Sequence, residues 1–128
     1  MLATQLDIWV DTFNLAKLLA QYQSGKTPRG DKGAFMPKYA RYGIMNECVN
    51  VVVSCLDIIY IANKNKKSRA IYYDTFLERL QGVHSRIRLM SEMRWLSVRQ
   101  STNIMTQMEI VGKQATALRN ASRISAAN

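Results

Sequence analysis

Four segments of the chain repeat apolar residues at intervals of three and four, and this spacing constrains the fold more than any other feature of the sequence. It places apolar side chains along one side of an α-helix, whereas a half-buried strand alternates apolar and polar residues. The segments cover residues 2–22, 38–63, 68–95 and 97–119. We therefore expect four amphipathic helices, with no room for a parallel sheet or a nucleotide-binding loop.

The expected inward stripe of the first helix is Leu6, Trp9, Val10, Phe13, Ala16 and Ala20. Ile8, Leu15, Leu18 and Leu19 lie off this stripe, so the helix is expected either to sit deep in the fold or to pack on another subunit. The other stripes run from Ile44 to Ala62, from Tyr72 to Met90 and from Ile104 to Leu118. The second is rich in β-branched residues, but it persists for longer than strands usually do, which favours a helix.

Turn and capping signals set the expected boundaries. Residues 24–34 hold three of the six glycines and one proline, which predicts a mobile basic loop. Ser68 is expected to cap the third helix, and Ser97 with Gln100 forms a capping-box pattern at the start of the fourth. Residues 120–128 are expected to fray. The prediction is an all-α, up-down antiparallel four-helix bundle in a single domain, residues 1–128.

The length of 128 residues and the 48% apolar content suit one domain with a core of its own. Cys48 and Cys55 lie seven residues apart, about 10 Å along a helix, which is too far for a disulfide. They are expected to be free thiols in a reducing compartment. With no secretion signal and no long apolar run, we expect a soluble, cytoplasmic protein of a bacterium or phage with no membrane partner.

Candidate catalytic groups are few. His84 is the only histidine, no GxSxG or CxxC motif occurs, and His84 is expected to be structural or solvent-facing. Asp74 and Glu78 share a helix face and are expected to neutralise Arg79 or nearby lysines rather than to bind magnesium. We therefore expect no metal, no cofactor and no enzymatic activity.

Basic residues dominate the charge, with 18 Lys and Arg against 9 Asp and Glu and a net charge of +9. A basic balance alone keeps many proteins soluble, so the position of the charges matters more than their number. The first 22 residues sum to −1, from Asp7, Asp11 and Lys17, and the excess lies further along the chain. The candidate residues for binding nucleic acid or a polymerase are Lys38, Arg41, Lys64, Lys66, Lys67, Arg69, Arg79, Arg86, Arg88 and Arg94. Arg79, Arg86, Lys66 and Lys67 are the strongest of these, and Lys26 and Lys32 follow.

Four short motifs occur in order between residues 36 and 114: Met36-Pro-Lys-Tyr-Ala-Arg-Tyr42, Cys55-Leu-Asp-Ile-Ile-Tyr-Ile-Ala62, Arg86-Ile-Arg-Leu-Met-Ser-Glu92 and Ile110-Val-Gly-Lys-Gln114. In them the chain resembles the accessory variability determinant (Avd) family of diversity-generating retroelements, which is similar to the four-helix-bundle proteins of ribosomal RNA intervening sequences. Lys38 and Arg41 would expose charge at one bundle end, Tyr39 or Tyr42 would offer packing or stacking, and Gly112 would let helices approach closely. The tail after Gly112 lacks the tryptophan often found there in the family.

The resemblance implies a four-helix bundle assembled as a pentameric ring, which accompanies a reverse transcriptase and binds RNA or DNA to support mutagenic copying of a template repeat. An alternative from the residues is a bundle that binds structured RNA, such as ribosomal RNA, without a polymerase. An enzyme is a weaker third possibility. A reverse transcriptase gene and a repeat pair beside the gene would favour the first.

Overall fold

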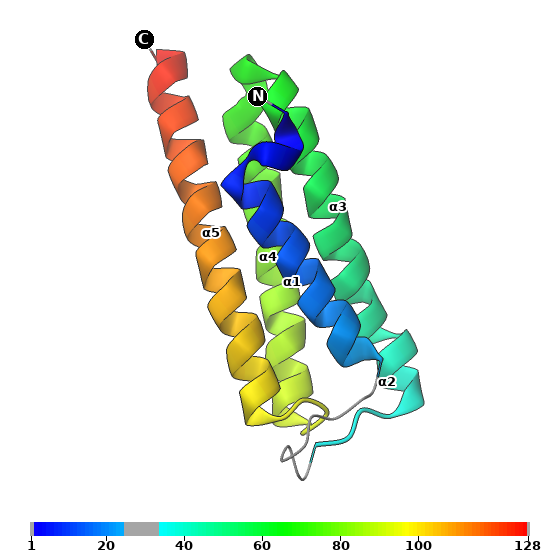
Figure 1. The fold of residues 1–128 in the computed structure, drawn as a ribbon. Coiled ribbons are helices and arrows are strands. Elements are labelled where there is room, and N and C mark those ends of the chain that lie inside the picture. The colour runs from blue at the N-terminus through cyan, green and yellow to red at the C-terminus, as the bar shows by residue number, and fades with distance from the viewer. Residues whose placement is uncertain (1, 25–33, 128) are drawn as a thin grey trace.

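The computed structural model describes residues 2–24 and 34–127. Its four long helices are α1 (Asp7–Gln23), α3 (Ile44–Lys64), α4 (Arg69–Glu92) and α5 (Val98–Ala127), joined by the short helix α2 (Lys38–Tyr42) and the 3-10 turns η1 (Ala3–Gln5) and η2 (Lys66–Ser68). Consecutive long helices run antiparallel (Figure 1), and α1 and α4 each pack against both α3 and α5. The predicted all-α, up-down four-helix bundle is confirmed.

The two ends of the bundle are named here by the short elements that close them. The α2 end holds α2, the beginning of α3, and the turn between α4 and α5, whereas the η2 end holds η2, the beginning of α1 and the end of α5 (Figure 1).

The core follows the predicted stripes in α4 and α5. In α4 the buried side chains are Tyr73, Phe76, Leu80, Val83, Ile87 and Met90, with Tyr73 in the place expected for Tyr72. In α5 the buried apolar side chains are Ile104, Met108, Val111 and Ala115. Met105 and Leu118 are half-buried against this core.

Helix α1 buries the side opposite to most of its predicted stripe. Ile8, Leu15 and Leu19 are at most 2% exposed, whereas Val10 and Phe13 are 43% and 41% exposed. Periodicity alone did not choose between the sides because both are apolar. Trp9 and Phe13 stack on the surface with ring centroids 5.1 Å apart. The helix also begins at Asp7 rather than Leu2, since residues 3–5 form the turn η1.

The helix expected over residues 38–63 is broken at Gly43. Its backbone leaves the helical region, with φ −99° and ψ −101°, and α2 and α3 meet there. A Cβ atom at Gly43 would lie 2.6 Å from the carbonyl oxygen of Tyr39, so the close approach of these two backbones requires a glycine.

Both cysteines are buried free thiols, as predicted. They lie on the inner side of α3, where burial raises the pKa of Cys48 and of Cys55 to about 12. The two side chains therefore act as small core residues with little thiolate character.

The segment Lys38–Lys64 contains an 18-residue window with a mean hydropathy of 1.6, of which 33% is buried, so by length and composition only it could cross a membrane. No spanning helix was expected from the sequence. Core helices of bundles meet the same criterion, and α3 buries Met45, Val52 and Ile59 against the other helices.

The predicted capping box at the start of α5 is confirmed. The Gln100 amide donates to Ser97 Oγ at 3.0 Å, and the Ser97 amide donates to Gln100 Oε1 at 2.9 Å. Ser68 is the N-cap residue of α4, as predicted, but it also ends η2 and its side chain makes no capping hydrogen bond.

Helix α5 continues to Ala127 instead of fraying after Arg119. Arg119 and Arg123 both reach Asp74 on α4, at 3.5 and 3.0 Å, and these contacts hold the last turns against the bundle. They also correct the expected partner of Asp74, which is α5 rather than Arg79 or a lysine. Most of the loop predicted over residues 24–34 lies outside the described residues, which resume at residue 34.

Candidate nucleic-acid interface

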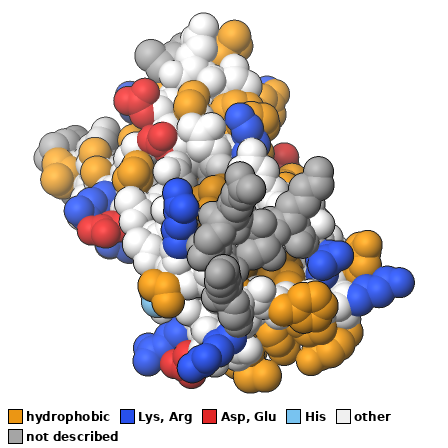
Figure 2. Space-filling view, turned by 60° about the horizontal axis from the view of Figure 1, so that its bottom comes forward, with side chains coloured by type: hydrophobic (Ala, Val, Ile, Leu, Met, Phe, Trp, Pro, Cys, Tyr) orange, Lys and Arg blue, Asp and Glu red, His pale blue; other side chains and the backbone are white. Residues whose placement is uncertain are grey.

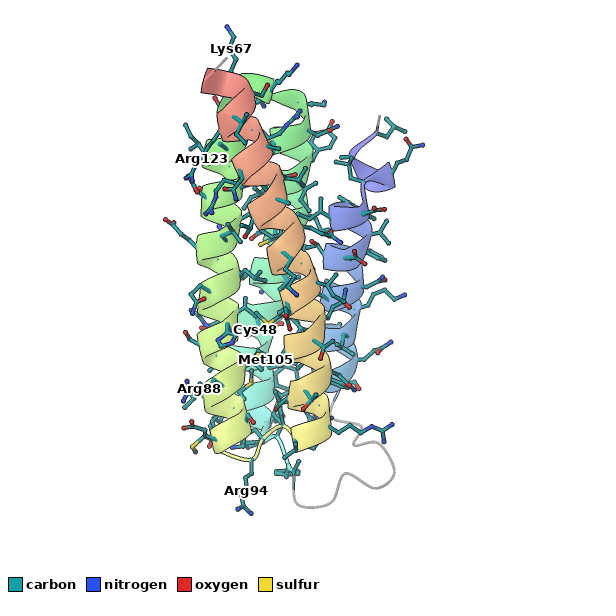
Figure 3. The ribbon with its side chains drawn as sticks, turned by 90° about the vertical axis from the view of Figure 1, so that its left-hand side faces the viewer. Cys48, Lys67, Arg88, Arg94, Met105 and Arg123 are labelled. Carbon is teal, nitrogen blue, oxygen red and sulfur yellow. The ribbon has the colours of Figure 1, made fainter. Side chains whose placement is uncertain are left out.

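The ten predicted basic residues do not form one surface. Lys64, Lys66, Lys67 and Arg69 lie at the η2 end, whereas Lys38, Arg41, Arg88 and Arg94 lie at or near the α2 end, where basic side chains lie beside a group of hydrophobic ones (Figure 2). Figure 3 shows Lys67 and Arg94 at opposite ends of the molecule. The 21 residues of α3 separate the ends by about 30 Å. Arg79 and Arg86 lie between them on α4.

At the η2 end, Arg69 has a structural role. Its guanidinium donates to the carbonyl oxygens of Ala62 at 3.0 Å and Asn63 at 3.1 Å, near the end of α3. The Ala62 carbonyl also accepts the Asn65 amide at 3.3 Å, and Arg69 adds a side-chain donor that ties the last turn of α3 to the start of α4. It is therefore a weaker candidate for phosphate binding than its sequence position indicates.

The three lysines at the η2 end differ in their surroundings. Lys64 Nζ lies 4.3 Å from the ring centroid of Tyr60 and donates to its hydroxyl at 2.5 Å. Lys66 and Lys67 are exposed, and no carboxylate pairs with either among residues 2–24 and 34–127. Their charges are therefore available to a phosphate.

Arg79 and Arg86 share a face, as predicted, and both reach across to α3. Arg79 donates to Ser54 Oγ at 2.8 Å, and Arg86 pairs with Glu47 at 3.2 Å. Arg86 also donates to the Gly82 carbonyl at 3.0 Å. The pairing offsets part of the charge of Arg86, although a pair this exposed to solvent contributes at most about 1 kcal/mol to stability.

Arg88 lies near the end of α4, and Arg94 lies in the turn between α4 and α5. Arg88 pairs with Glu92 at 3.4 Å, and both side chains are exposed. Arg94 is exposed and has φ 60°, a left-handed conformation that reverses the chain between α4 and α5. Its carbonyl accepts a hydrogen bond from the Phe35 amide at 3.1 Å, which fastens the segment before α2 to this turn.

Lys38 and Arg41 belong to α2. Lys38 is exposed, whereas Arg41 is half-buried and donates from Nη2 to the Met36 carbonyl at 3.5 Å. Within the described ranges Arg41 Nε is buried and has no hydrogen-bond partner. The ten candidates did not include Arg99, whose exposed side chain lies at the same end in the first turn of α5. The sequence feature that could have pointed to a binding surface at the α2 end is the alternation of basic and aromatic residues from Lys38 to Tyr42.

An open groove of about 940 Å³ runs along the outer side of α4 and α5. Its floor includes Leu77, Met105 and Gly112, and the exposed His84 lies on its rim, in agreement with the solvent-facing alternative for this histidine. Gly112 is not needed for close helix packing, contrary to the expectation, since an added Cβ would meet Leu80 at an ordinary 3.6 Å. Among the described residues, no three His, Cys, Asp or Glu side chains are grouped so that they could hold a metal ion.

No protein-family model matches the chain, and neither the curated proteins nor the solved structures include a significant match to it. The resemblance to the Avd family therefore rests on the four motifs alone.

Proposed function

We propose that this protein is a non-enzymatic accessory protein of a diversity-generating retroelement. In this role it binds a reverse transcriptase and the template RNA or its cDNA through basic surfaces, in the cytoplasm of a bacterium, and supports mutagenic reverse transcription. The ordered motifs that resemble the Avd family support the polymerase partner. The charge distribution supports the nucleic acid.

The observation that carries the proposal is the lack of carboxylate partners for the cations at both ends of the bundle. Lys38 and Arg94 at one end, and Lys66 and Lys67 at the other, have no ion pair within the described residues. A cation that is not neutralised within the protein can release counterions from a phosphate backbone when it binds there. Such binding holds a nucleic acid without reading its sequence.

We also propose that the protein assembles into a homo-oligomer, for which the resemblance implies a pentamer. Val10, Phe13 and Val53 are 43%, 41% and 46% exposed on the outer side of α1 and α3. The partly apolar groove lies on the other side of the bundle, along α4 and α5. Two different surfaces that pair head to tail generate a closed ring when the rotation between copies allows it. Light scattering tests this, and a stable monomer of 14.6 kDa at micromolar concentration would contradict it.

The salt dependence of binding tests the electrostatic part of the proposal. Anisotropy of a labelled single-stranded RNA, measured at two or more salt concentrations, gives the slope of log affinity against log salt. Each lost phosphate contact lowers the steepness of this slope by about 0.7, so K66Q combined with K67Q should lower it by about 1.4 if both lysines contact phosphates.

Lys113→Gln is the matched control. Lys113 is also an exposed lysine, but it pairs with Glu109 at 3.0 Å on α5, away from both ends. Its loss should leave the slope unchanged. Because Lys113 lines the groove along α4 and α5, light scattering must first show that the variant keeps the assembly of the parent protein. Binding that does not depend on salt, or that strongly prefers one sequence, would contradict the electrostatic proposal.

The alternative of a bundle that binds structured RNA without a polymerase keeps the same basic surfaces. Pull-down with a reverse transcriptase encoded beside the gene separates the two. Absence of such a gene and of a repeat pair nearby would favour the alternative.

A further inference from the structure

Three aromatic rings project from the α2 end. Phe35 and Tyr39 are each 72% exposed and Tyr42 is 64% exposed, and no other aromatic side chain among the described residues is exposed as much. Burial of an aromatic ring is strongly favourable, so three rings in solvent at one end of a small bundle form an apolar patch that suits a ligand.

The surrounding backbone holds these rings in place. The Phe35 amide donates to the Arg94 carbonyl at 3.1 Å, so the segment before α2 is tied to the turn between α4 and α5. The Tyr39 ring lies edge-on to Trp95 of that turn, with centroids 5.8 Å apart and an interplanar angle of 88°. Tyr39 and Tyr42 are three residues apart on α2, which places them as neighbours on the helix surface.

Three basic residues belong to the same short elements as the rings. Lys38 and Arg41 alternate with Tyr39 and Tyr42 along α2, and Arg94 lies in the adjoining turn. None of the three cations has an ion pair in the part of the chain that the structure describes. Figure 2 shows basic and hydrophobic side chains side by side at this end. The nearby Arg88, by contrast, is paired with Glu92.

From this arrangement we propose that the α2 end is a stacking platform for the unpaired bases of a single-stranded nucleic acid, with Phe35, Tyr39 and Tyr42 as stacking residues and Lys38, Arg41 and Arg94 as phosphate contacts. Exposed aromatic faces beside cations match a strand whose bases and phosphates are both accessible. A duplex hides its base faces in the stack, so it presents only phosphates to this end. The inference rests on the proposed function and adds the form of nucleic acid and the surface that binds it.

The test compares two probes that carry the same number of phosphates. One is a labelled oligothymidylate of about twelve nucleotides, within the length that such sites bind, and the other is an abasic strand of equal length. The full chain should bind the oligothymidylate at least about tenfold more tightly, which corresponds to about 1.4 kcal/mol. Replacing the rings by Y39L with Y42L should remove most of this difference and change the affinity for the abasic strand by less than about twofold.

Tyr60→Leu is the matched control because Tyr60 is also an exposed tyrosine, 51% exposed, but lies on α3 toward the η2 end. It should retain the preference for the strand with bases. A second measurement leaves the three rings of the α2 end unchanged. In the Trp9→Phe variant, Trp95 is the only tryptophan left in the chain. Its fluorescence should be quenched by the oligothymidylate and not by the abasic strand.

Equal affinity for the two strands, with no difference in quenching, would overturn the platform. If that binding still falls steeply with salt, the proposed electrostatic function stands. If no nucleic acid binds at all, the platform and the nucleic-acid part of the proposed function both fail. If Y39L with Y42L keeps the preference for bases but loses the reverse transcriptase in a pull-down, the rings dock an acidic protein surface and the platform is wrong.

Discussion

Replacement of Gly43 by alanine should destabilise the bundle at the junction of α2 and α3. A Cβ there would lie 2.6 Å from the Tyr39 carbonyl oxygen, about 0.8 Å closer than an ordinary contact of 3.4 Å or more. The neighbour is backbone and has no rotamer with which to move away, so α2 must shift. Overpacking of this kind costs about 1–3 kcal/mol, and the lower entropy of the unfolded alanine chain offsets at most about 1 kcal/mol. These terms leave a net loss between about 0 and 3 kcal/mol, and an overlap of this size with backbone puts the expected loss near the middle of that range, about 1–2 kcal/mol.

Gly112→Ala is the matched control, because the same substitution there meets only Leu80 Cδ2 at 3.6 Å inside α5. Alanine is favoured over glycine in a helix interior by up to about 1 kcal/mol, so this variant should gain stability. For a domain of this size 1 kcal/mol corresponds to roughly 3–5 °C in Tm, so the two variants should move Tm in opposite directions. Thermal unfolding followed by circular dichroism measures both, at one protein concentration, because the Tm of an assembling protein depends on its concentration. A G43A variant as stable as the parent would refute the close-approach argument.

Three further predictions follow from the described contacts. Replacing Arg79 and Arg86 together by alanine should cost at most about 1.5 kcal/mol in stability, since the exposed Arg79 contributes under about 0.5 kcal/mol and the Arg86–Glu47 pair at most about 1 kcal/mol. The variant should bind RNA more weakly and pull down less polymerase, and unchanged binding of both by a folded variant would exclude the α3/α4 face. Asp74→Asn should change the free energy of unfolding by less than about 1 kcal/mol but speed amide hydrogen exchange in α5 beyond Arg119, because it removes the ion pairs of Asp74 with Arg119 and Arg123. Equal exchange rates in the variant and the parent would show that these ion pairs are not needed to order the last turns. Burial raises the pKa of the Cys48 and Cys55 thiols from 9.0 to about 12, so between pH 9 and pH 12 the folded state binds more protons than the unfolded state. The free energy of unfolding should therefore fall as the pH rises from about 9 to 12. Substitution of both cysteines by alanine should lessen that fall, which urea titrations at several pH values measure.

Local sequence determined the class of fold. Apolar residues at intervals of three and four predict the buried stripes of α4 and α5 except for Tyr73, which is buried in place of Tyr72, because burial on one side of a helix requires that period. The capping box of Ser97 and Gln100 was equally readable, since both of its hydrogen bonds join residues three apart.

Tertiary contacts decided the features that involve distant residues. Periodicity did not show which side of α1 faces inward, because Ile8 and Phe13 belong to two competing apolar sides and only packing against α3 and α5 selects one. The order of the last turns of α5 depends on Asp74, 45 residues before Arg119 in the chain. The amino-acid composition around Arg119, which predicts a frayed end, does not show this distant partner.

The candidate site shows the same division. The sequence determined that the protein is basic and that cations alternate with aromatic residues from Lys38 to Tyr42, because charge and composition are properties of the residues themselves. Only the tertiary structure separated the predicted cations into two ends about 30 Å apart and showed that Arg69 is engaged by the carbonyls of α3. It also brought Trp95 against Tyr39 across 56 residues of chain. Helix periodicity determines which residues share one side of a helix. The place of a side chain on the surface of the protein depends on how the helices are joined and packed.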